Sequence, residues 1–222
     1  KIKLRQRVAI DMSNRTLETK MINQPVSMPV AIAPTGLTGM QRADGEILAA
    51  QAAEEFGIPY TLSTMSVCSI EAVAEKTKTP FWFQLYVMKD KKFMERLIDR
   101  AKEAKCSALV LTLDLQLLGQ RHKDLRNGLS TPPKLIPKHI YQVLTRPIWC
   151  LRMLTTKNHF FGNIVGHVEG IKDVRSLSSW ISTQFDQKLD WKEVDWIRKR
   201  WGGKLIIKGI LDSEDALLAS KT

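Results

Sequence analysis

Polar side chains recur at the carboxyl ends of the chain's short apolar runs, and they are the residues best suited to chemistry. Each of them follows or closes a run of aliphatic or aromatic residues. Burying such groups without partners costs roughly 1–3 kcal/mol each, so a shared polar ligand would account for them together. The set comprises Thr35, Ser63, Gln84, Tyr86, Thr112, Asp114 and Lys208, and Thr35 lies between Pro34 and Gly36 at the end of the first run.

Taken singly, several of these residues have a simpler interpretation. Ser63, Gln84 and Thr112 could bond neighbouring backbone at strand ends, and Tyr86 could be a packed aromatic residue with its hydroxyl at the rim. Lys208 directly follows Leu-Ile-Ile, where an ammonium group is costly unless it is paired. A salt bridge across the fold is therefore the alternative to ligand binding for this lysine.

Other familiar chemical motifs are missing from the sequence. All four histidines fall between residues 119 and 190 and none ends an apolar run, which argues against a histidine base or metal site in this stretch. No G-x-G-x-x-G or P-loop pattern occurs, which argues against nucleotide-binding folds of those types. The three cysteines are widely spaced, so neither a disulfide framework nor a zinc site is indicated, and a reducing cytoplasm is the simpler expectation.

The elements that must position the strand-end residues alternate between strand and helix. The apolar runs are continuous, which is typical of strands buried on both faces in a parallel sheet. A repeat of about 25 residues favours a (β/α)8 TIM barrel, of which five units are present. Five strands cannot close such a barrel, so either this is a fragment or the fold is not a barrel. The predicted strands are Met28–Pro34, Ile58–Ser63, Pro80–Val87, Ser107–Leu113 and Lys204–Lys208, and the predicted helices are Arg42–Phe56, Ser69–Lys76, Lys89–Lys105, Trp191–Trp201 and one that starts after Asp212.

We predict one incomplete barrel domain over residues 1–222, with a long insertion after the fourth strand at about 119–190. The formal net charge is +11, and eight basic residues but only one acidic residue lie between Gly119 and Phe160. No run of 18 apolar residues occurs, so no membrane span is expected. Apolar and cationic groups are mixed in this insertion, which predicts an interfacial segment that binds an anionic membrane surface. A solvated loop and a nucleic-acid site are the alternatives. The residues that mix in this way are Arg146, Ile148, Trp149, Leu151, Arg152 and Met153.

The strand ends resemble those of the FMN-dependent L-2-hydroxy acid dehydrogenases and oxidases. The most specific matching pieces are MPVAIAPTGLTGM, PYTLSTMSVCSIEAVAE, PFWFQLYVMKD, LVLTLDLQLLGQRHKD and LIIKGILDSEDA, in the family's order. The chain looks most similar to the bacterial quinone-linked L-lactate dehydrogenases. The resemblance implies oxidation of L-lactate to pyruvate, with electrons passed through FMN to a respiratory quinone. It also implies a peripheral position on the anionic cytoplasmic face of the inner membrane, or else a cytoplasmic one, and a homo-oligomer, commonly a tetramer.

The resemblance also assigns roles to single residues. Pro34, Thr35 and Gly36 would lie along the flavin, Ser63, Gln84 and Thr112 would bond its ring, and Lys208 would sit by N1 and the C2 carbonyl. Tyr86 would bond the substrate, Arg121 would clamp the substrate carboxylate, and Asp114 would orient the catalytic histidine.

Some features depart from the family pattern. The family's histidine base lies in a Ser-Asn-His-Gly-Gly-Arg motif after strand six, and these 222 residues contain no such motif. We therefore expect this stretch alone not to turn over substrate. Leu115-Gln116 replaces a common Thr-Pro, Met65 replaces an aromatic residue of plant glycolate oxidase, and Gly36 replaces an alanine common in oxidases. A soluble oxygen-using 2-hydroxy acid oxidase and a truncated non-catalytic fragment are the alternative functions.

Overall fold

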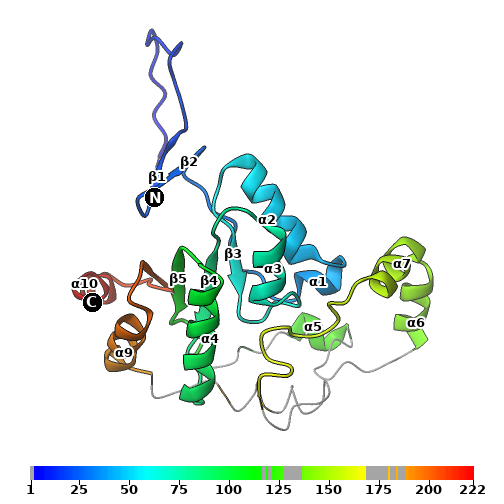
Figure 1. The fold of residues 1–222 in the computed structure, drawn as a ribbon. Helices are drawn as coiled ribbons and strands as arrows, with labels where there is room; N and C mark the ends of the chain where they lie inside the picture. Colours follow the sequence, from blue (N-terminus) through cyan, green and yellow to red (C-terminus); the bar gives the residue numbers. More distant parts are fainter. Residues whose placement is uncertain are drawn as a thin grey trace.

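A four-stranded parallel sheet forms the centre of the molecule (Figure 1). The computed structural model describes residues 3–116, 119, 122–127, 137–168, 180, 184 and 189–222. The strands follow one another in chain order across the sheet, as right-handed strand–helix–strand units require. They are β3 (Thr61–Ser63), β4 (Trp82–Tyr86), β5 (Ala108–Thr112) and β6 (Leu205–Lys208).

Helices connect the strands and begin where side chains cap their first turn. The carboxylates of Asp90, Asp190 and Asp212 and the hydroxyl of Ser69 each accept a bond from a free backbone N–H of the following turn. These caps place the helix starts within two residues of the predicted ones. The helices are α1 (Thr38–Gln41), α2 (Gly45–Phe56), α3 (Ile70–Lys76), α4 (Lys91–Glu103), α9 (Trp191–Trp201) and α10 (Ser213–Lys221).

The two faces of the sheet differ in what they bury. Because side chains alternate between faces, Phe83 and Leu85 of β4 share one face with Leu109 and Leu111 of β5. This helix-side face packs against α2, α3, α4 and α9 in the main hydrophobic core, where all four of these side chains are fully buried. The core therefore lies between the sheet and its helices, as in a (β/α) barrel.

The opposite face, here called the inner face, is apolar only at its amino end. Trp82, Ala108 and Val110 form a small second cluster there with Ile206. An antiparallel hairpin of β1 (Thr19–Met21) and β2 (Gln24–Val26) covers this cluster, and the Trp82 indole N–H donates to the Gln24 side chain at 3.2 Å. This hairpin was not predicted from the sequence. It closes one end of the inner face and leaves the carboxyl end of the strands for polar groups.

The predicted first strand, Met28–Pro34, is reduced to one bridge between Ile32 and Tyr60. The Ile32 amide donates to the Pro59 carbonyl, and the Thr61 amide donates to the Ile32 carbonyl. Pro29 and Pro34 lack backbone N–H groups, so the run cannot extend this ladder at either end. The prediction of a full strand was wrong, although the segment lies beside β3 as predicted.

The described residues of the insertion contain three helices that were not predicted from the sequence. They are α5 (His122–Arg126), α6 (Pro137–Leu144) and α7 (Pro147–Thr155), of which α6 and α7 lie at the opposite end of the molecule from α10 (Figure 1). Proline occupies the first position of α6 and α7, where its missing N–H costs no intrahelical bond. In the part of the chain that the structure describes, no helix has the length and apolar character needed to span a bilayer.

Candidate functional site

Three polar side chains at the carboxyl ends of β3, β4 and β5 form one hydrogen-bonded row, here called the polar row. The Ser63 hydroxyl donates to Gln84 Oε1 at 3.1 Å, and Gln84 Nε2 donates to Thr112 Oγ1 at 3.0 Å. The Met65 amide donates to the Ser63 hydroxyl oxygen at 3.1 Å and extends the row into the loop after β3. Gln84 and Thr112 lie on the inner face, and Ser63 is in register with Gln84. Parallel strands thus bring together the three residues, as predicted.

The polar row is buried but retains donors for a ligand. Ser63, Gln84 and Thr112 are 2%, 0% and 4% exposed, so each needs partners to offset its desolvation. They bond one another rather than only neighbouring backbone. A primary amide has two N–H donors and a hydroxyl has one. Among the described residues, only one Gln84 N–H bond is formed and the Thr112 hydroxyl acts as an acceptor, which leaves one donor on each.

Lys208 and Asp114 form an ion pair at the end of the row. Lys208 Nζ lies 3.6 Å from Asp114 Oδ2, and the two side chains are 44% and 40% exposed. Lys208 is exposed although it follows three aliphatic residues, because it lies beside Thr112 in register, at the open end of the strands. Lys208 therefore has an ion-pair partner at the neighbouring strand end. A pair this exposed contributes little stability, so both charges stay available to a ligand at low cost.

Gly209 lets Asp114 approach the end of β6. Its φ is +103°, a backbone conformation that residues with a side chain rarely adopt. A Cβ at Gly209 would lie 2.7 Å from both Cβ and Cγ of Asp114, too close for any side chain. The glycine therefore fixes the position of the Lys208–Asp114 pair in addition to ending the strand.

Tyr86 closes β4 two residues after Gln84 and pairs in register with Thr112. Its backbone amide donates to the Thr64 hydroxyl at 3.4 Å, and its half-buried ring packs against the helix-side core. This is a position at the rim, next to the polar row. A phenol hydroxyl there can serve a small polar ligand while the ring remains packed.

The loop after Ile32 packs on the loop after β3. The Leu37 amide donates to the Met65 carbonyl at 3.0 Å, and a Cβ at Gly36 would lie 3.3 Å from that same oxygen. Pro34 and Gly36 are partly exposed and Thr35 is exposed. The residues that the sequence analysis grouped at Pro34–Gly36 are thus next to the end of the polar row.

Arg121, the predicted carboxylate clamp, lies outside the described residues. The structure brings together the other predicted site residues at the carboxyl ends of the strands. Two buried polar residues nearby, Glu46 and Asn163, were not predicted. Neither ends an apolar run, and Asn163 lies in the insertion, so no periodic pattern marks them.

The donor set fits the edge of a flavin ring. That edge presents carbonyl oxygens and ring nitrogens, and it collects negative charge on reduction. The polar row offers N–H and O–H donors with hydroxyl acceptors, and Lys208 adds a cation. The described residues include no cluster of three or more histidine, cysteine or acidic side chains that could hold a metal ion.

Comparison with known proteins agrees with this fit. The family model described as FMN-dependent dehydrogenase matches residues 1–222. An L-lactate dehydrogenase of Acinetobacter baylyi is 45% identical over 216 residues, and one of Acinetobacter baumannii is 46% identical. Both alignments cover 97% of this chain but only 56% of the relative, so the chain spans little more than half the length of these proteins.

Solved structures show the same relationship. The monotopic membrane protein (S)-mandelate dehydrogenase superposes with a TM-score of 0.89 at 30% identity, covering 99% of this chain and 58% of that one. Mandelate oxidase with (S)-4-hydroxymandelic acid superposes with a TM-score of 0.74 at 28% identity, covering 97% and 54%. The predicted fold, a partial FMN-linked (β/α)8 barrel, is therefore confirmed.

Proposed function

Because the chain belongs to the family of FMN-dependent dehydrogenases, we propose that it forms the flavin-binding part of an enzyme that oxidises L-lactate to pyruvate. The single observation that carries the proposal is the buried polar row with a cation at its end, on a chain 45–46% identical to L-lactate dehydrogenases. The relatives support lactate in particular, and the row supports the flavin.

The residues of the polar row would hold the flavin ring through its polar edge. FMN, when bound, supplies the acceptor for the two electrons that leave the hydroxy acid carbon. The unused donors of Gln84 and Thr112 would bond the ring, and Ser63 would hold Gln84 in the required orientation. Lys208 would add positive charge where negative charge collects on reduction. Pro34, Thr35 and Gly36 would lie along the ring.

Substrate residues would surround the same edge. The Tyr86 hydroxyl would bond the hydroxy acid, and Arg121 would bind its carboxylate through the guanidinium fork. Asp114 would orient and charge-stabilise a histidine that takes the substrate's hydroxyl proton. The four histidines of this chain lie in the insertion and none ends a strand, so we infer that this base comes from outside the 222 residues. The stretch alone is then expected to bind flavin without turnover.

We further infer that a respiratory quinone is the electron acceptor. The test compares quinone reduction with hydrogen peroxide release by the flavin-loaded enzyme in air, with L-lactate as the substrate. Quinone reduction that outpaces peroxide release supports the dehydrogenase. Peroxide release at the rate of lactate consumption, whether or not quinone is present, would show that the enzyme is a soluble oxidase.

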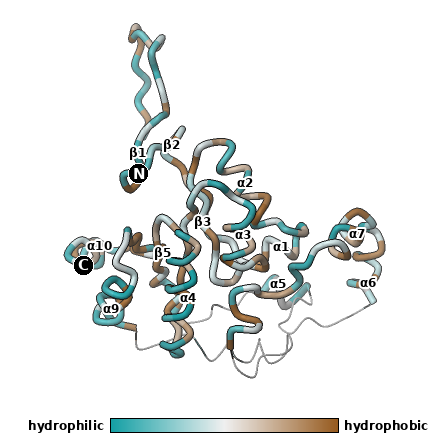
Figure 2. Tube along the Cα trace, viewed as in Figure 1, coloured by the Kyte–Doolittle hydropathy of each residue, from teal (hydrophilic) through white to brown (hydrophobic). Residues whose placement is uncertain are grey.

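The insertion supports binding to an anionic membrane surface. Ile148, Leu151 and Leu154 are spaced three apart along α7 and are 67%, 65% and 81% exposed, so they form one apolar face. The trace of α7 carries both hydrophobic and hydrophilic residues (Figure 2). Trp149 instead faces the molecule, where its indole N–H donates to the Met40 carbonyl at 3.0 Å. Met153, four residues later, is also half-buried. Only part of the predicted apolar group is therefore available to lipid.

Cations lie next to this apolar face. A cleft of about 510 Å³ between α1 and the start of α7 is lined by Arg42, Arg146 and Arg152. Among the described residues, no carboxylate pairs with these arginines. Arginines beside an exposed apolar helix face suit the phosphates and acyl chains of a bilayer surface. The cytoplasmic side of the inner membrane is where such an enzyme would meet both lactate and quinone.

Membrane binding can be measured by co-sedimentation with vesicles of phosphatidylglycerol and phosphatidylethanolamine. The Ile148→Ser/Leu151→Ser/Leu154→Ser variant should lose most binding, and added salt should weaken binding by the wild type because the arginine contacts are screened. A Leu211→Ser/Leu217→Ser variant, which also removes exposed leucines but far from α7, is the matched control and should bind normally. Equal binding by all three proteins would exclude α7 as the membrane contact.

A further inference from the structure

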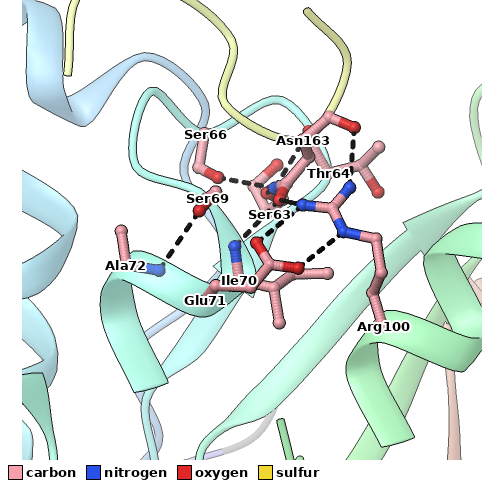
Figure 3. A network of polar contacts seen from close by, with 9 residues as sticks. All are labelled: Ser63, Thr64, Ser66, Ser69, Ile70, Glu71, Ala72, Arg100 and Asn163. Atoms are coloured by element: carbon pink, nitrogen blue, oxygen red, sulfur yellow. Dashed lines mark hydrogen bonds and ion pairs between the residues drawn. The ribbon is translucent and has the colours of Figure 1, made fainter. Parts of the chain in front are cut away.

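Asn163, a residue of the insertion, contacts the loop that follows β3 (Figure 3). Its side chain is fully buried, and Nδ2 donates to the Ser66 hydroxyl at 2.9 Å. The same Nδ2 lies 3.3 Å from the Ser63 carbonyl oxygen and 3.5 Å from that of Thr64. Oδ1 accepts from the Ile70 amide at 2.9 Å. One side chain thus bonds both ends of the loop from Ser63 to Ile70.

The neighbours of Asn163 hold it firmly in the fold. Gly162 lies so close to the loop that a Cβ would be 2.7 Å from both the Ser69 nitrogen and the Val67 oxygen, and its amide donates to that oxygen at 3.1 Å. Ile164 is fully buried in the main core. Residues 162–164 of the insertion are therefore packed into the domain.

Arg100 of α4 supports Asn163 from the helix side. Its guanidinium donates to the Asn163 carbonyl at 3.1 Å and makes a two-pronged bond to Glu71 at 2.6 and 2.8 Å (Figure 3). Partial burial raises the pKa of Glu71, but the bonds that its carboxylate accepts, chiefly those from Arg100, together have the larger, opposite effect. The pKa of Glu71 is therefore lowered to about 2. The pair is thus fully charged at neutral pH, and it fixes the backbone of Asn163 against α3 and α4.

These bonds reach the polar row through Ser63. The Ser63 carbonyl faces Asn163, while its hydroxyl donates to Gln84 and accepts from the Met65 amide. Met65 in turn accepts from the Leu37 amide of the preceding loop. A shift of the Ser63–Ser66 turn would therefore change both the orientation of Gln84 and the packing of the Pro34–Gly36 loop.

We propose that Asn163 is a positioning residue for the flavin: its amide N–H donors fix the Ser63–Ser66 turn and, through Ser63, the donors of the polar row. This inference rests on the proposed flavin site. It gives residues 162–164 of the insertion a role in cofactor binding that is separate from any membrane contact of α7.

The sharpest variant is Asn163→Asp, which keeps the acceptor for the Ile70 amide and Arg100 but removes the N–H donors. A carboxylate would face the carbonyl oxygens of Ser63 and Thr64 and repel them. We expect FMN to dissociate from the diluted holoenzyme with a Kd raised about tenfold, because a misplaced row loses one well-formed bond or more. The flavin absorption spectrum should shift, and amide hydrogen exchange at residues 63–70 should speed up.

Ser69→Ala is the matched control, because it removes a bond of the same loop without touching Asn163. The Ser69 hydroxyl caps α3 by accepting from the Ala72 amide at 3.1 Å (Figure 3). We expect this variant to lower Tm while Kd and the flavin spectrum stay unchanged. If the Asn163→Asp variant fails to fold, Ser66→Ala serves instead, because it removes the hydroxyl that accepts the shortest bond from Asn163 Nδ2. A raised Kd for FMN is expected in that variant too.

The outcomes separate this inference from the proposed function. A wild-type protein without bound FMN would contradict the proposed flavin site itself. A wild type that binds FMN, beside Asn163→Asp and Ser66→Ala variants with unchanged Kd and spectrum, would overturn the positioning role alone. Equal effects of Ser69→Ala and Asn163→Asp on Kd would also overturn it, since loop stability would then explain both.

Discussion

Lys208→Met is expected to lower the two-electron reduction potential of the bound flavin by roughly 30–60 mV and to slow lactate oxidation ten- to a hundredfold. A cation about 4 Å from an anion stabilises it by up to about 4 kcal/mol at an effective dielectric of 20. The Lys208 side chain is 44% exposed, so solvent screening should reduce this to about 1–3 kcal/mol. Methionine keeps most of the side-chain volume, so the loss is one of charge.

Lys204→Met is the matched control for this prediction. Lys204 is exposed and lies directly before β6, at the end of the sheet remote from the polar row. The potential and the rate should not change in this variant. If the flavin of the Lys208→Met variant has the same reduction potential as that of the wild type, Lys208 does not contact the flavin. The ion pair with Asp114 would then be the whole role of Lys208.

Gln84→Met is expected to have the larger effect on stability, because Gln84 is the centre of the polar row. The change leaves the fully buried Ser63 and Thr112 hydroxyls without their bonds to the amide. Two such losses should lower the free energy of unfolding by about 2–4 kcal/mol. The affinity for FMN should fall as well, by about a hundredfold, because the amide orients the row and supplies a donor.

Gln51→Met provides the comparison for Gln84→Met. The Gln51 amide makes one exposed bond, to the Lys76 carbonyl at 3.0 Å, so its loss should cost under about 1 kcal/mol and leave FMN affinity unchanged. Urea unfolding and flavin fluorescence give both quantities. A Gln84→Met protein that keeps wild-type affinity for FMN would contradict the proposed arrangement of the ring against the row.

Much of this site was predictable from the sequence, for a simple physical reason. Parallel strands place their carboxyl ends at one edge, so Ser63, Gln84 and Thr112 must meet once each run is identified as a strand. Their mutual hydrogen bonds were not predictable. In a continuous apolar run both faces of the strand look alike, so the sequence does not show which residues lie on the inner face. Lys208 is exposed because it ends β6, where Ile206 and Ile207 before it are themselves only half-buried.

Long-range polar contacts account for most of what the sequence did not indicate. Asn163 lies 100 residues from Ser63 along the chain, and nothing local marks it as buried. Glu46 is similar: its carboxylate is fully buried and accepts from the Val67 amide at 3.0 Å, which follows only from the packing of α2 on the loop after β3. The β1–β2 hairpin was missed because strands of three residues are too short to show a period of two.

The most direct test of the account is anaerobic titration of the flavin-loaded protein with L-lactate, followed by the visible absorption of the flavin. We predict that the protein carries about one FMN per chain, as a single ring-binding row implies. With its histidine base present, L-lactate should bleach the flavin fully and D-lactate should not. A protein that carries no FMN, or whose FMN stays oxidised under excess L-lactate, would contradict the assignment of the polar row to flavin-dependent lactate oxidation.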